Sequence, residues 1–391
     1  MKDNDAKSQS KSINLKSAHE LREQMQEKNS DEIFIEDGFN EKFIAHLKDI
    51  FKFASEDEIN SVMKMCIIPQ LYTKYDSPLT YSLINTYESI VLDSLKILNY
   101  DLLDGVSIGV IKKDDLTAEQ TKVIMTNASV INISENLLLT INRYSKLLAK
   151  SLAINIVGKD SFVIDRNIQR CIDENLRDKQ LQYEWDMFFA DHALSLNTPY
   201  KGAAIDLKSY EELSLFDALS TSMTIFVLGH EYGHHVMKHS YNGEVCTASH
   251  REDEYRIDEY EADRVAFEIS TASSTLELNG DIKFFLYANI GALLVFTMFD
   301  YIKMAHSILD KGSISYDVNI EGSHPSGPNR YNEFIRFITS EYRLEDIPHI
   351  RDFHGFITSL TDHIWSNSQN HIMKMYEHGF RPKDNENGWL P

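Results

Sequence analysis

Residues 221–240 read TSMTIFVLGHEYGHHVMKHS, with the pentapeptide HEYGH at positions 230–234. Apolar and histidine side chains recur at helical spacing along and just before this stretch, at Leu219, Met223, Phe226, Val227, His230, His234 and Met237. Positions four residues apart lie about 6 Å from each other on one face of a helix. We therefore predict a helix that carries both imidazoles of the pentapeptide toward the interior of the protein.

Two imidazoles at this spacing can bind one zinc ion and leave its other coordination positions open. Glu231 lies one step around the helix, beside the ion, where a carboxylate can take a proton from a zinc-bound water. Gly233 keeps the helix thin where another group can approach closely. A single histidine on an apolar face is usually a core residue, but this pair with a glutamate between them favours a metal site.

A second helix is expected over residues 253–270, DEYRIDEYEADRVAFEIS. Glu259 and Asp263 are four residues apart and share a face with Ala266 and Phe267, so both carboxylates are expected on the core side. A catalytic zinc takes three protein ligands, and two histidines with one glutamate form an established set. We predict that Glu259 completes the ligand set and that Asp263 accepts the free ring N–H of a ligating histidine.

The composition narrows the classes of function. The net charge of −21 argues against binding to nucleic acid or to an anionic membrane surface. Cys66, Cys171 and Cys246 are odd in number and form no CxxC pair, so neither a disulfide framework nor a cysteine zinc site is expected. The opening residues, MKDNDAKSQSKS, lack the apolar core of a secretory signal, and we expect a cytoplasmic protein.

One long apolar run covers residues 284–299, FFLYANIGALLVFTMF. It is 16 residues long and contains Asn289, whereas a helix needs about 20 apolar residues to cross a bilayer. We predict a buried core helix here and no membrane span.

Strand signals are few. Residues 106–111 are expected to form a strand, and Val130, Ile131 and Ile133 predict a second one that leads into a helix near Ser134. Most of the remaining periodicity is helical. The expected organisation is a mobile polar tail at 1–30, a helical region at 31–120, a main domain at 121–345 with an insertion at about 140–215, and a helical extension at 346–391.

Four segments together resemble the gluzincin metallopeptidases, in the class that includes HtpX-like and CAAX-prenyl-type proteases. Residues 127–139, NASVINISENLLL, are similar to the edge strand and following helix of that class. Residues 230–239, HEYGHHVMKH, match its zinc helix and include the later His239. Residues 256–264, RIDEYEADR, match its glutamate-ligand helix, and residues 323–330, SHPSGPNR, match its HP loop and arginine.

The resemblance implies one catalytic zinc ion held by His230, His234 and Glu259. It also implies a role at the metal for His324, which would either bind the ion as a latch or donate a hydrogen bond to the developing oxyanion. Arg330 is a second candidate donor, with a structural salt bridge as the alternative.

The chain departs from this class in two respects. The stretch between the expected edge strand and the zinc helix, about 90 residues, is longer than usual, and the transmembrane hairpins of the class are missing. The two zinc motifs in a cytoplasmic chain also resemble the Lit-type phage-exclusion peptidases.

We predict an α+β fold with a mostly helical zincin-type domain and a small sheet whose edge strand can pair with an extended substrate. The expected function is that of a zinc-dependent endopeptidase acting on a protein or peptide, with Glu231 as general base. Two alternatives remain open, a Lit-like defence or regulatory protease that a partner triggers and a zinc-stabilised interaction module without proteolysis.

Overall fold

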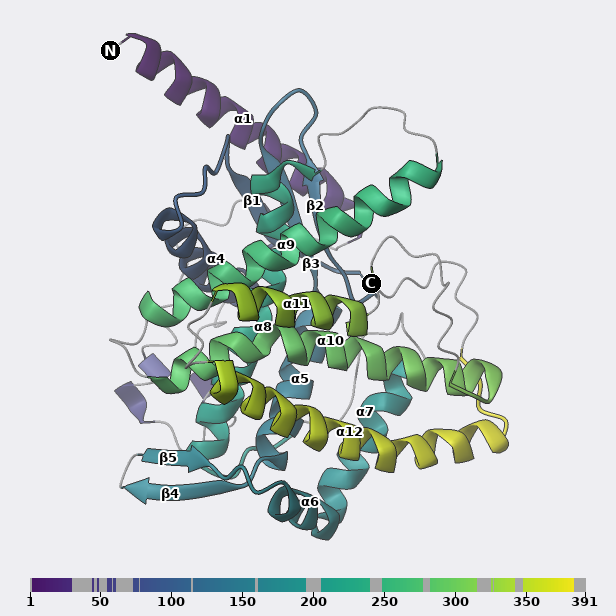
Figure 1. Cartoon of the computed structure of the whole chain (residues 1–391). Coiled ribbons are helices and arrows are strands. Elements are labelled where there is room, and N and C mark those ends of the chain that lie inside the picture. The colour runs from purple at the N-terminus through teal and green to yellow at the C-terminus, as the bar shows by residue number, and fades with distance from the viewer. Residues whose placement is uncertain are drawn as a thin grey trace.

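The computed structural model describes residues 2–29, 44–45, 48, 55–57, 59–60, 73–76, 78–113, 115–158, 161–194, 205–239, 248–276, 282–314, 325, 327–341 and 347–382. Most of these residues lie in helices (Figure 1). The elements are α1 Lys2–Glu27, α4 Pro78–Ile97, β1 Val106–Ile111, β2 Ala118–Lys122, β3 Ser129–Ser134, α5 Glu135–Ser151, β4 Ile154–Gly158, β5 Ser161–Ile164, α6 Ile168–Arg177, α7 Lys179–Leu194, α8 Tyr210–Met237, α9 Ala248–Leu276, α10 Ile282–Lys311, α11 Gly327–Glu341 and α12 Ile347–Glu377.

Helix α8 contains the HEYGH pentapeptide, so the predicted helix is confirmed. It begins after Ser209, whose side chain accepts a hydrogen bond from the backbone N–H of Glu212, the usual arrangement of an N-cap. Its side chains are buried on almost every side along its second half, because α9, α10 and α5 all pack against it. The predicted apolar stripe is therefore only part of the buried surface of a central helix.

A three-stranded sheet lies beside α8, with the strand order β1-β3-β2. Strand β1 pairs parallel with β3, and β2 pairs antiparallel with it. The predicted strands are confirmed, and Ser134 ends β3 and caps α5, as expected. However, β3 is the central strand and not the expected edge strand, because β2 occupies its second side. The sequence of β2, AEQTK, has no apolar alternation that would reveal a strand.

Helix α1 occupies most of the segment that we expected to be a mobile polar tail. Ala18, Arg22 and Gln26 are buried on the face of α1 that packs against β1 and β3. Arg22 forms an ion pair with Asp76 at 2.9 Å and donates to the backbone oxygen of Ile108. A polar composition indicates a solvated segment, but here the buried polar side chains find partners, so the helix is held on the sheet.

The region that we expected to be an insertion contributes to the core. Helices α5 and α7 bring together the rings of Tyr144, Trp185, Phe188 and Phe189, with neighbouring centroids 5.3 to 5.9 Å apart. Phe189 also packs on Trp365 of α12 at 5.1 Å. The hairpin of β4 and β5 lies at the far end of the molecule from the three-stranded sheet (Figure 1).

One hydrophobic core extends from Ile84 in α4 to Ile372 in α12. It crosses the expected boundaries near residues 120 and 345. Two helical stretches, α8 and residues 290–311 of α10, are long and apolar enough to cross a membrane, but 61% of the most apolar window of each is buried inside the protein. This burial is typical of core helices, and within the apolar run for which we expected a core helix it is described for residues 290–299.

Candidate metal centre

Helices α8 and α9 cross at two glycines of α8. A Cβ atom on Gly233 would lie 2.8 Å from the Cα atom of Ala262, and one on Gly229 would lie 3.0 Å from the Cα atom of Ala266. The two backbones can approach this closely only because each glycine faces an alanine. The close approach predicted at Gly233 is therefore that of α9, which carries Glu259 and Asp263.

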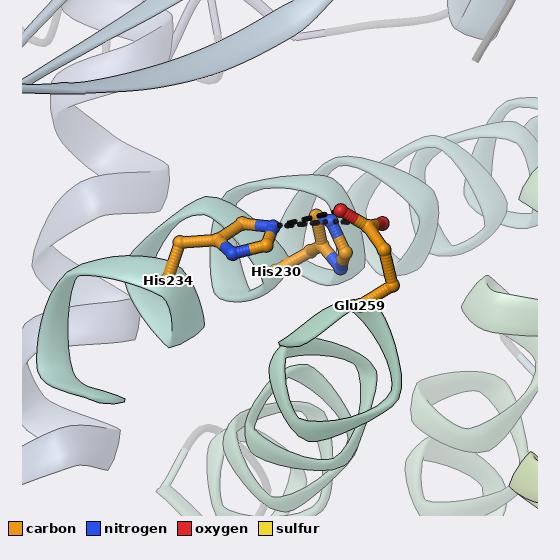
Figure 2. Close-up of side chains that lie close together, drawn as sticks. All are labelled: His230, His234 and Glu259. Carbon is orange, nitrogen blue, oxygen red and sulfur yellow. Dashed lines mark hydrogen bonds and ion pairs between the residues drawn. The ribbon is translucent and has the colours of Figure 1, made fainter. Parts of the chain in front are cut away.

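The crossing brings three candidate ligands together (Figure 2). The Nε2 atoms of His230 and His234 are 3.1 Å apart, and each lies 3.4 Å from an oxygen of the Glu259 carboxylate. Ligand atoms at the corners of a tetrahedron around zinc, with bonds of about 2.0 to 2.2 Å, are separated by about 3.3 to 3.6 Å. The three side chains therefore fit a single metal ion of this size.

The three candidate ligand side chains differ in how far they are exposed to solvent. His230 and Glu259 are buried, whereas the side chain of His234 is 14% exposed. Solvent therefore reaches the group from the His234 side. A site of this kind keeps its ligands fixed and still admits a water molecule or a substrate.

Asp263 lies behind His230, as predicted. Its Oδ1 atom is 2.9 Å from Nδ1 of His230, and its Oδ2 atom accepts a hydrogen bond from Nε of Arg330 at 2.8 Å. Burial raises the pKa of Asp263, but the Arg330 guanidinium outweighs this and holds the pKa below its usual value. Because Asp263 is then a carboxylate, His230 donates from Nδ1, and its Nε2 atom faces Glu259 and His234.

The charge around His230 favours a cation. Burial lowers the pKa of this imidazole, but the carboxylates of Glu259 and Asp263 raise it to about 10. Burial lowers the pKa of His234, which therefore tends to remain neutral. With a pKa of about 10, His230 is protonated at neutral pH and balances the charge of Glu259. A metal ion bound at Nε2 of His230 would take the place of that proton.

Arg330 is in the first turn of α11, as expected, and its guanidinium binds Asp263. The salt bridge that we gave as its structural alternative is thus present. Asp300 of α10 accepts a hydrogen bond from the backbone N–H of Gly327, and burial raises the pKa of Asp300 to about 6. This contact fixes the start of α11 and so the position of Arg330. His324 lies outside the described residues.

Glu231 is buried on α8 beside the ligands, with 6% of its surface exposed. Its negative charge contributes to a raised pKa of the Arg330 guanidinium, so the two groups lie in the same electrostatic environment. Glu231 is therefore close to the candidate ligands His230, His234 and Glu259 but is not one of them.

Two further histidines next to the pentapeptide, His235 and His239, also contribute to the site. His235 is fully buried and lies between Ser129 of β3, at 2.8 Å, and the backbone oxygen of Leu102, at 3.0 Å. These contacts hold α8, the helix that carries the candidate ligands His230 and His234, against the sheet. His239 contacts His234 at 2.9 Å between their Nδ1 atoms. The sequence signal for both was their place beside the pentapeptide. The partners of His235 are distant in the chain, whereas His239 meets His234 only because the helix ends at Lys238.

The site residues are brought together by these contacts. The described chain brings His230, His234, Glu259, Asp263 and Arg330 into one cluster, from three helices that are far apart in sequence. Comparison of the chain with models of protein families, with curated proteins and with solved structures finds no match.

Proposed function

We propose that the protein is a zinc-dependent metallopeptidase of the gluzincin type, which hydrolyses peptide bonds. The observation that carries this proposal is the convergence of His230, His234 and Glu259. The two Nε2 atoms are 3.1 Å apart, and each lies 3.4 Å from a different oxygen of the Glu259 carboxylate. Two imidazoles and one carboxylate favour zinc over harder cations such as magnesium or calcium, which prefer oxygen ligands. The hydrogen bond from His230 to Asp263 adds the outer support that zinc-ligating histidines usually have.

When bound, zinc supplies Lewis acidity that makes water a nucleophile at neutral pH. Glu231 then acts as the general base. Its carboxylate accepts a proton from the attacking water, whose oxygen bonds to the carbonyl carbon of the substrate. The same carboxyl group gives that proton to the amine nitrogen when the C–N bond breaks, so Glu231 ends the cycle as it began.

Strand β2 is our candidate for the strand that lies alongside an extended substrate. It is an outer strand of the sheet and packs against α8, whereas β3, the strand first expected in this role, is central. Main-chain pairing with a sheet edge is a common way to hold a peptide in an extended form. The substrate class proposed is therefore an extended segment of a protein or peptide.

A zinc-stabilised interaction module is the second candidate. Glu259 and the two histidines belong to different helices, so an ion between them would also join α8 to α9. The role of Glu231 distinguishes the two candidates. A catalytic site needs this carboxylate as a base, whereas a purely structural site does not need it. A trigger by a partner and a cytoplasmic location stay predictions.

Metal analysis and a cleavage assay separate the two candidates. The purified protein should contain about one equivalent of zinc, cleave members of a peptide library, lose that activity with a chelator and regain it with added zinc. Bound zinc without any cleavage of protein or peptide substrates would support the interaction module. Cleavage that survives complete removal of metal would contradict the proposal.

A further inference from the structure

A second group of chemically active side chains lies next to the candidate metal ligands. It consists of His239, Asp258 and Glu261. The Nδ1 atom of His239 is 2.9 Å from Nδ1 of His234, and its Nε2 atom is 3.1 Å from Glu261 and 3.8 Å from Asp258. A continuous series of contacts therefore runs from a candidate ligand to two carboxylates of α9.

The backbone is shaped to make the first of these contacts. Residues five apart on a regular helix point in directions about 140° apart, so His239 could not meet His234 if α8 continued. Instead, Lys238 ends the helix in the left-handed conformation, with φ 64° and ψ 32°. Lysine is less stable than glycine in this conformation, and such strain is common where function requires it. The turn folds His239 back over His234.

Proton positions follow from the contacts. A metal at Nε2 of His234 requires a proton on its Nδ1 atom, because a neutral imidazole has one N–H. Nδ1 of His239 must then accept that hydrogen bond, which leaves the proton of His239 on Nε2. That N–H points toward Glu261 and Asp258, both of which accept hydrogen bonds when ionised. Every atom in the series thus has a compatible role.

We infer that His239 is a positioning residue, which holds His234 in the tautomer that presents Nε2 to the metal and is itself oriented by Glu261 and Asp258. The inference rests on the proposed function, since it takes the ion to lie between His230, His234 and Glu259. It gives each ligating histidine its own outer partner, Asp263 for His230 and His239 for His234. Outer partners of this kind usually change metal affinity by 10- to 100-fold.

A second metal ion among His239, Asp258 and Glu261 is the competing interpretation. It would need the lone pair of Nε2 on His239, and so would move the proton of His239 to Nδ1, facing Nδ1 of His234. That proton would then compete with the one that His234 needs there to bind its own ion. The side chain of Glu261 is also 47% exposed, which is normal for an acidic residue without a metal. The positioning role of His239 is therefore the interpretation that is compatible with an ion bound by His230, His234 and Glu259.

The test measures zinc affinity by competition with a chromophoric chelator, for the full-length wild type, His239→Ala, His239→Asn and the control His378→Ala. His239→Ala should weaken zinc binding 10- to 100-fold. His239→Asn keeps a carbonyl oxygen close to the position of Nδ1, so its affinity should return to within a few-fold of wild type. His378 is exposed at the far end of α12, and its replacement should leave the affinity unchanged.

Selective labelling of histidine with ¹⁵N gives a readout in the zinc-loaded wild type that needs no variant. The inference predicts that His234 is protonated at Nδ1 and that His239 is neutral and protonated at Nε2. Protonation of His239 at Nδ1 alone, or a second tightly bound equivalent of zinc that is lost in His239→Ala, would overturn it. Equal zinc affinity in His239→Ala and wild type would also overturn it and would leave the proposed function standing, whereas wild type without any bound zinc would remove both.

Discussion

At the scale of single residues, Asp263 joins the candidate ligands to the rest of the fold. It accepts hydrogen bonds from His230 on one side and from Arg330 on the other; His230 and Asp263 are buried, and the side chain of Arg330 is 12% exposed. The pair Asp263–Arg330 is thus a buried ion pair as well as an outer support for a ligand. Its removal should affect both stability and metal binding, and the two effects can be separated.

Asp263→Asn should lower zinc affinity 10- to 100-fold, since the amide supports His230 less strongly than a carboxylate does. It should also leave the Arg330 charge buried without its partner, which typically costs 3 to 5 kcal/mol of unfolding free energy. The double variant Asp263→Asn with Arg330→Met should recover most of the stability, measured by denaturant unfolding, but not the affinity. Recovery of both would show that Asp263 has only a structural role.

His230→Ala and Glu259→Ala should each remove most of the bound zinc, because neither leaves three converging ligand atoms. Metal content after dialysis against a weak chelator measures this directly, with His349→Ala on the exposed start of α12 as the matched control. A full equivalent of tightly held metal in either ligand variant would mean that the ion is bound elsewhere.

At the scale of elements, the crossing of α8 and α9 determines where Glu259 lies. Gly233→Ala adds a methyl group 2.8 Å from the Cα atom and 2.9 Å from the backbone oxygen of Ala262, so α9 must shift. We expect a loss of roughly 1 to 3 kcal/mol in stability from overpacking and a weaker hold on zinc. Gly355→Ala in α12 is the matched control, because nothing lies within 4 Å of the added atom, and it should stabilise by about 0.5 to 1 kcal/mol.

A partly buried acid, Glu88, joins α4 to α8. Tyr232 donates a hydrogen bond to Glu88 at 2.6 Å, and burial raises the pKa of Glu88 to about 7. The folded protein therefore holds this proton between pH 4.5 and about 7, where the unfolded chain releases it, so the contribution of Glu88 to stability falls as pH rises through this window.

Glu88→Gln should remove that dependence, since glutamine resembles the neutral acid. In metal-free protein, denaturant unfolding should give similar stabilities for wild type and Glu88→Gln near pH 5 and a more stable variant near pH 8. A difference between the two proteins that is constant with pH would argue against a raised pKa of Glu88.

The elements that could be predicted are those whose signal lies in their own residues. The spacing of apolar and histidine side chains gave α8, and Ser134 marked the junction of β3 and α5. Strand β2 and the packing of α1 could not be predicted, because their place depends on partners far away in the chain. Arg22, for example, becomes a buried residue only through Asp76 and Ile108. The central position of β3 in the sheet could not be predicted for the same reason, because it depends on the pairing with β2.

At the scale of the whole molecule, one core connects regions that composition separates. The residues behind the candidate site come from α4, α5, α7, α10 and α12 as well as from α8 and α9. The clustering of the candidate ligand residues could be predicted from helical spacing, whereas the contacts of Arg330, His235 and His239 needed the assembled fold. These contacts join residues that are distant in sequence or that meet only across a left-handed turn.

Removal of the metal should loosen the molecule at the crossing of its two central helices. At a free zinc concentration 100 times the dissociation constant, binding contributes about 2.7 kcal/mol. A chelator should therefore lower the unfolding temperature by several degrees, as measured by scanning calorimetry, and the Glu259→Ala variant should show almost no such shift. An equal shift in both proteins would place the metal outside this crossing.

The most direct measurement for the central claim compares wild type with Glu231→Gln at equal zinc content on a peptide library, with cleavage products read by mass spectrometry. The proposed function predicts that both proteins bind one equivalent of zinc and are equally folded, and that the variant cleaves about 100- to 10,000-fold more slowly. Cleavage at the wild-type rate by zinc-loaded Glu231→Gln would contradict it.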